Sequence, residues 1–173
     1  MTVLEEGDLQ ITINDAIEAR KFDDEASHGL SHCMKAVDFV VELPDRYLFI
    51  EVKDPQDPQA PPEASHEFIQ QFQTGKLYED LKYKYRDSFL YEWAAGRADK
   101  KPIDYLVLVA LDALDRSHLL RGQEELQRKL PLRGPGSRPW TRPIVRGCGV
   151  FNIASWNLYF PEYPVKRLSR DGS

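Results

Sequence analysis

The chain has few cysteines and no long apolar segment, and each absence excludes a class of protein. Its 173 residues include only two cysteines, Cys33 and Cys148, which are too few and too far apart for a metal-cluster spacing. We therefore expect free thiols in a reducing compartment. No apolar run is long enough to cross a membrane, and no basic segment followed by an apolar one opens the chain. The sequence thus predicts a cytoplasmic protein with no membrane segment.

A general excess of basic residues is also lacking, since the formal net charge is −5. This value does not favour a nucleic-acid binder, but the distribution is uneven. Residues 1–62 contain 14 acidic and 5 basic side chains, whereas residues 133–173 contain 2 and 7. The basic end of the chain would suit phosphate contacts. An ordinary solvated surface explains the asymmetry equally well.

The most informative stretch runs from Lys35 to Lys53 and predicts two β-strands joined by a turn. Apolar side chains alternate with others over 37–43 and again over 47–53, with Pro44 and Asp45 between them. Because Pro44 cannot adopt the positive φ of a two-residue type I′ turn, we favour a four-residue loop over 43–46. In that register Asp38 lies opposite Glu51. A three-residue loop would instead put Asp38 opposite Val52.

The pairing of Asp38 with Glu51 has a chemical consequence. Facing residues of a hairpin project to the same side, with Cβ atoms roughly 4.5–5.5 Å apart, so the two carboxylates repel each other. A hard divalent cation bound through oxygen ligands would neutralise them. Lys53 lies two residues further along the same face, within reach of a metal-bound water or a scissile phosphate.

The pattern Asp38-x12-Glu51-x-Lys53 resembles the PD-(D/E)xK nuclease superfamily, which has the restriction-endonuclease-like fold. The resemblance implies an α/β domain over residues 1–173, with a three-layer core in which helices flank a mixed β-sheet. It implies an endo- or exonuclease that depends on Mg²⁺ or Mn²⁺. Asp38, Glu51 and the carbonyl of Val52 would hold the metal, and Lys53 would position the water or stabilise the transition state.

Members of this superfamily often place a Glu from the preceding helix in the metal site. Alternating residues 9–13 predict a short strand, and a helix from Asn14 to about Glu25 follows in our interpretation. Glu18 is the best match to the family Glu on that helix. The competing acidic residues are Asp15, Asp23, Asp24 and Glu25.

The rest of the chain fits the same order of elements. Residues 64–95 predict a long helical region that Gly75 kinks or splits, the apolar run 103–111 predicts a central strand, and 116–130 predicts another helix. No Gln, Lys or Arg between 70 and 86 can be assigned to the site. Residues 131–143 form a loop with Trp140 and three arginines, which suits either a nucleic-acid contact or an ordinary surface loop. A further strand over 144–153 and a short helix to Tyr159 complete the prediction.

Three interpretations of the Asp38, Glu51 and Lys53 face remain open. The first is a metal-dependent nuclease, with DNA favoured over RNA as the substrate. The second is a catalytically inactive binding or assembly module on the same fold. The third is a solvated hairpin face on which Lys53 merely neutralises one acid. The resemblance also allows a homodimer, because many related nucleases cut as pairs.

Overall fold

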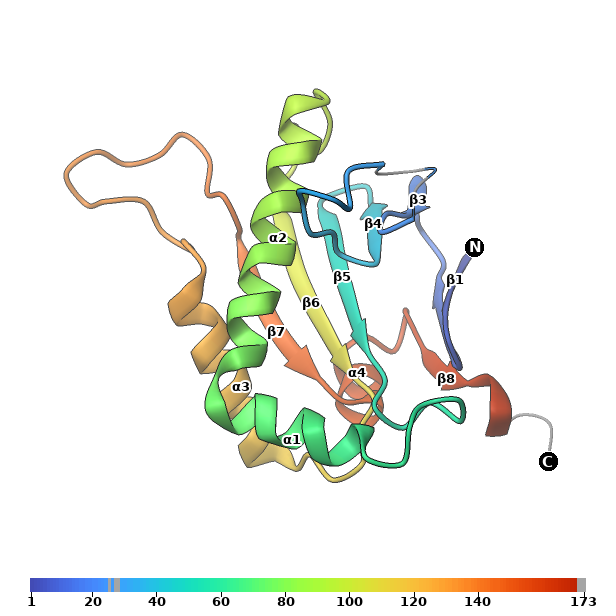
Figure 1. The fold of residues 1–173 in the computed structure, drawn as a ribbon. Coiled ribbons are helices and arrows are strands. Elements are labelled where there is room, and N and C mark those ends of the chain that lie inside the picture. The colour runs from blue at the N-terminus through green and yellow to red at the C-terminus, as the bar shows by residue number, and fades with distance from the viewer. Residues whose placement is uncertain (25, 27–28, 171–173) are drawn as a thin grey trace.

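The computed structural model describes residues 1–24, 26 and 29–170, and it is an α/β protein (Figure 1). Its strands are β1 (Thr2–Glu6), β2 (Leu9–Ile13), β3 (Glu18–Lys21), β4 (Phe39–Glu42), β5 (Tyr47–Lys53), β6 (Ile103–Val109), β7 (Gly147–Phe151) and β8 (Val165–Arg167). Its helices are α1 (Ala64–Thr74), α2 (Lys76–Ala94), α3 (Arg116–Lys129) and α4 (Ile153–Tyr159). Within the described residues, no helix is long and apolar enough to span a bilayer.

The larger sheet has five strands in the order β3-β4-β5-β6-β7. The pairs β3–β4 and β4–β5 are antiparallel, whereas β5–β6 and β6–β7 are parallel, so the sheet is mixed. Parallel neighbours need long crossover connections, which α1 and α2 provide between β5 and β6 and α3 provides between β6 and β7. The apolar run that was predicted as a central strand is β6, and it is buried on both faces.

Two separate apolar cores cover the two faces of this sheet. Helices α1, α2 and α3 pack over one face. The core between these helices and the sheet includes Phe49, Tyr85 and Tyr105, which are fully buried. The other face carries a three-stranded antiparallel sheet, β1-β2-β8, together with α4, and its core includes Ile50 and Trp156. Strand alternation assigns Glu51 and Lys53 to the face of Phe49, because successive side chains point to opposite faces. The face under the helices therefore receives the polar end of β5.

The predicted helix over 14–25 is wrong. Residues 18–21 form β3, which pairs with β4 from Glu18 opposite Glu42 to Lys21 opposite Phe39, and Glu25 lies outside the described residues. The outer edge of β4 needs a hydrogen-bonding partner, and this pairing overrides the helix propensity of Glu, Ala, Arg and Lys.

The other element predictions are close to the structure. Strand 9–13 is β2, and the helical region 64–95 divides at Gly75, whose φ of 80° ends α1 and begins α2. The hairpin 2–13 was not predicted, although Gly7-Asp8 between two alternating segments is a strong turn signal. Gly7 has a φ of 54°, which suits glycine in such a turn.

Arg167 of β8 clasps the small sheet to the loops that follow β5 and β6. Its guanidinium donates to both carboxylate oxygens of Asp54 at 2.8 Å and to the carbonyl of Ala110 at 3.1 Å. It also lies 3.3 Å from Asp8 in the β1–β2 turn. Both partners of the Arg167–Asp54 pair are almost completely buried.

Replacing Arg167 by Met should strongly destabilise the protein, because the buried carboxylate of Asp54 loses its partner. We expect a loss of about 3–5 kcal/mol in the free energy of unfolding, measured by urea denaturation. Arg128→Met is the control, since Arg128 forms only exposed ion pairs, and it should cost less than about 1 kcal/mol. Similar losses in the two variants would contradict the clasp.

Candidate metal-binding and catalytic site

The β4–β5 hairpin brings Asp38 and Glu51 together as the sequence predicts. Phe39 pairs with Ile50, and one further step in the same register places Asp38 opposite Glu51. The backbone N–H of Leu43 donates to the carbonyl of Arg46 at 2.8 Å and closes the four-residue loop. Asp38 is 4% exposed and Glu51 is 0% exposed, so both carboxyls are buried beneath α2.

Two backbone hydrogen bonds fix Asp38. Its Oδ2 accepts from the N–H of Val52 at 2.5 Å, and its own carbonyl accepts from the N–H of Phe22 at 2.7 Å. The N–H and C=O of a strand residue point to the same side of the strand, so the carbonyl of Val52 also faces the edge where Asp38 lies. The predicted backbone ligand is therefore on the correct side of β5.

Two lysines accompany the carboxyl pair. The Nζ of Lys53 and the Nζ of Lys84 each lie 2.7 Å from Oε1 of Glu51, and Lys84 is also 3.8 Å from Oδ1 of Asp38. Lys84 belongs to α2 and lies in the stretch that sequence reasoning left unassigned. It bridges the two acids in the free protein.

Ser88 sets the position of Lys84 relative to the hairpin. The Ser88 hydroxyl donates to the carbonyl of Lys84 at 2.7 Å and accepts from the N–H of Val37 at 2.9 Å. Ser88 is fully buried, one helical turn after Lys84. In the sequence, Ser88 is a small polar residue that follows Leu81 and Tyr85 at helical spacing, and this break in the apolar face is a signal that the last turns of α2 contact a polar part of the fold.

The electrostatics of the pair are unfavourable without a cation. Burial, and then the charge of Glu51, raise the pKa of Asp38 to about 8, although Lys84 and the Val52 N–H act in the opposite direction. Burial lowers the pKa of Lys84, but the charges of Glu51 and Asp38 outweigh it and the pKa is raised. Neither carboxylate oxygen of Glu51 accepts a hydrogen bond of acceptable geometry from any described residue. The ion pairs alone leave Glu51 under-satisfied.

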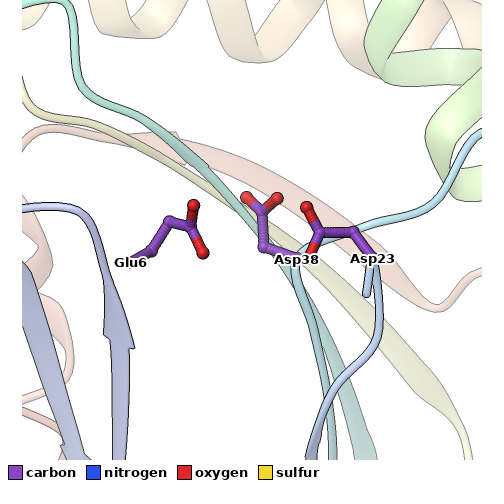
Figure 2. A group of neighbouring side chains, drawn as sticks. All are labelled: Glu6, Asp23 and Asp38. Carbon is purple, nitrogen blue, oxygen red and sulfur yellow. The ribbon is translucent and has the colours of Figure 1, made fainter. Parts of the chain in front are cut away.

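Glu6 and Asp23 extend the acidic group around Asp38. One carboxylate oxygen from each of the three residues lies within 4.8 Å of the others (Figure 2). Glu6 comes from the end of β1, and Asp23 follows β3 directly after the buried Phe22. Asp23 was one of the open alternatives to Glu18. Glu6 was missed because the β1–β2 hairpin was not predicted.

The structure does not bring Glu18 into this group. Glu18 lies opposite Glu42 at the far end of β4. Glu42 is four residues from Asp38, which corresponds to about 13 Å of extended chain. Its side chain is 56% exposed and pairs with Arg20 at 3.1 Å. The site that the structure assembles therefore consists of Asp38, Glu51, Lys53 and Lys84, with Glu6 and Asp23 beside it.

The raised pKa of Asp38 predicts a pH-dependent stability. An unfolded Asp titrates near 3.9, so between about pH 4 and pH 8 the folded protein binds the proton more tightly, and its stability falls as the pH rises through this window. Asp38→Asn removes this titration and keeps an acceptor for the Val52 N–H. At pH 8 in EDTA, its Tm should exceed the wild-type Tm by about 2–4 °C for each kcal/mol that the substitution adds to the free energy of unfolding. This difference in Tm should shrink toward pH 5. Asp45→Asn, on the exposed turn, serves as the control; a pH-independent difference for Asp38→Asn would argue against the buried pair.

Searches against protein-family models, curated proteins and solved structures find no match to this chain. The structure supplies two buried carboxyls on adjacent strands, two ammonium groups within 2.7 Å of one of them, and further acids at the rim.

Proposed function

We propose that the protein is a metal-dependent nuclease that hydrolyses phosphodiester bonds of DNA or RNA. The observation that carries this proposal is the burial of Asp38 directly beside Glu51, with the oxygens of Glu51 lacking hydrogen bonds and Lys53 alongside. Two acids buried side by side are costly to keep even with lysines beside Glu51, whereas a divalent cation would bind both acids at once.

The donor set suits Mg²⁺ or Mn²⁺. It consists of oxygen atoms only, from Asp38, Glu51 and the backbone of Val52, and hard divalent cations prefer such ligands. Glu6 and Asp23 add carboxylates next to Asp38 and would serve an outer ligand or a second cation. No Cys or His is required, and this agrees with a hard-cation site rather than a zinc site.

The arrangement of elements also supports a restriction-endonuclease-like core. Asp38 precedes β4, the Glu51-x-Lys53 pair lies on β5, α2 follows and packs beside the site, and β6 then runs parallel to β5. The mixed sheet lies between α1–α3 and a second layer made of β1-β2-β8 and α4, which gives three layers (Figure 1). The departure from the family pattern is the absence of a helix in the described residues before β4, where β3 runs instead.

Each side chain has a definable role in hydrolysis. When bound, Mg²⁺ supplies a more acidic water and polarises the phosphate. Asp38 releases its proton as the site fills, since its pKa of about 8 applies to the metal-free protein. Lys53 is 26% exposed and thus reaches the open side of the site, where its ammonium orients the attacking water or stabilises the developing charge. Lys84 holds the two acids together before metal binding.

A screen with labelled single-stranded and duplex DNA and RNA should reveal cleavage in Mg²⁺ or Mn²⁺ and none in EDTA. Glu51→Gln and Lys53→Met should each lower the cleavage rate by roughly 100-fold or more, because each removes a group from the reacting centre. Glu124→Gln and Lys100→Met are matched controls on the exposed surface and should cleave like wild type. Undiminished cleavage in Glu51→Gln and Lys53→Met would reject the assigned site.

Metal binding should release a proton and strengthen as the pH rises. Because Asp38 is protonated below about pH 8, the affinity for Mn²⁺ or Mg²⁺ should increase between about pH 6 and pH 8. Titration calorimetry in two buffers of different ionisation enthalpy measures the released proton directly. Asp38→Asn should abolish both the release and the pH dependence, and their persistence in this variant would assign the proton to another group.

A second candidate is a binding or assembly module without turnover on the same fold. The favouring observation is that Lys53 and Lys84 already neutralise Glu51 in the absence of any cation. In that case the wild-type protein binds no divalent metal by calorimetry, and Lys84→Met, which exposes the acid pair, acquires the ability to bind it. Metal binding by the wild-type protein favours the nuclease.

A further inference from the structure

A long connection between α3 and β7 projects from the body of the protein. We call residues 131–146 the arm; Figure 1 shows it extending outward past α3, at the edge of the molecule. It contains no helix or strand, and most of its residues are exposed. Connections of this length without secondary structure are uncommon in compact domains and usually have a function.

The base of the arm is anchored, and two of its four arginines are used for that purpose. Arg142 donates from Nη1 to the carbonyl of Ala98 at 3.2 Å, and Arg146 donates from Nε to Asp104 at 2.9 Å. The hydroxyl of Tyr85 on α2 donates to the carbonyl of Ile144 at 2.7 Å. The end of the arm that leads into β7 is thus fixed to the larger sheet and to α2.

The two arginines nearer the tip are different. Arg133 and Arg138 are exposed, and no carboxylate of the described chain lies within ion-pair distance of either. The sequence contains no acidic residue between Glu125 and Glu162, whereas six basic residues lie in that interval. The tip therefore carries uncompensated positive charge in a protein whose overall charge is negative.

The arm has a defined shape although its tip, residues 133–141, adds nothing to either apolar core. Prolines recur at 131, 135, 139 and 143 and restrict the backbone. The Trp140 ring packs so closely over Gly134 that a Cβ at Gly134 would lie 2.8 Å from it, which joins the outgoing and returning halves. Arg138 also donates its backbone N–H to the carbonyl of Pro135 at 3.2 Å. This stiffness lowers the entropy that the arm loses when a partner binds.

We propose that the arm binds the phosphate backbone of nucleic acid through Arg133 and Arg138, as a docking surface separate from the metal site. The inference rests on the proposed nuclease function, because it assigns the arm to the same substrate. Guanidinium groups pair with phosphate oxygens in a bidentate geometry. The tip, residues 133–141, contains no acidic side chain, so its charge is complementary to a polyanion. Its sequence-independent contact would hold the substrate while Asp38, directly before β4, and Glu51, on β5, engage one phosphodiester.

The test measures binding of a fluorescently labelled DNA duplex by the full chain in EDTA, as a function of salt concentration. Arg133→Ala/Arg138→Ala should weaken binding about tenfold at low salt and lower the salt slope by about 2, the value for two lost phosphate contacts. Arg133→Lys/Arg138→Lys should recover most of the slope. Arg116→Ala/Arg121→Ala on α3 removes the same charge from exposed positions and should keep the wild-type slope.

An unchanged slope in the arm variant, or an equal loss in the α3 control, would overturn the proposal. So would a wild-type protein that binds poly-glutamate as tightly as DNA through the same two arginines, since the partner would then be an acidic protein. Failure of the nuclease is recognised separately, because binding in EDTA needs no catalysis. If the protein never cleaves nucleic acid but Arg133→Ala/Arg138→Ala weakens DNA binding, the proposal for the arm stands and the nuclease function is rejected.

Discussion

The hydrogen bond from the Val52 N–H to Asp38 is the interaction on which the candidate site depends. It forms because the four-residue loop sets the register of β4 and β5, and it places a carboxylate at the exact edge where β4 begins. With Asp38 held there, its carboxyl group lies next to that of Glu51, because both side chains project to the face under α2. The helix then has to supply positive charge to a buried acidic pair, and Lys84 does so.

The fold explains why this polar pair is tolerated inside an apolar protein. Strands β4 and β5 are apolar over most of their length, and the two buried acids lie directly before β4 and near the end of β5. At that point the helix layer offers Lys84 and Ser88, the β1–β2 hairpin offers Glu6, and the segment after β3 offers Asp23. Four separate parts of the chain meet at one place, so the chemistry is concentrated without weakening the two apolar cores.

The hairpin and its two acids could be predicted from sequence because the evidence is local. Alternation defines the strands, Pro44 excludes the tightest turn, and the register follows with no knowledge of the rest of the chain. Glu18 could not be placed correctly, because the residues around it favour a helix and pairing with the open edge of β4 overrides that preference. The positions of Lys84 and Glu6 in the site depend on packing between distant parts of the chain. Local patterns therefore give only partial signals for them, at Gly7-Asp8 and at Ser88.

The clasp made by Arg167 joins distant parts of the chain. Glu6 is opposite Leu9 in the β1–β2 hairpin, and Leu9 is opposite Arg167 in β8, so the rim of the acidic group and Arg167 belong to the same small sheet. The hairpin that brings Asp38 and Glu51 together forms from contacts that are local in the sequence. Its acidic rim, in contrast, is supported only when residues as far apart as Glu6 and Arg167 have assembled into one sheet.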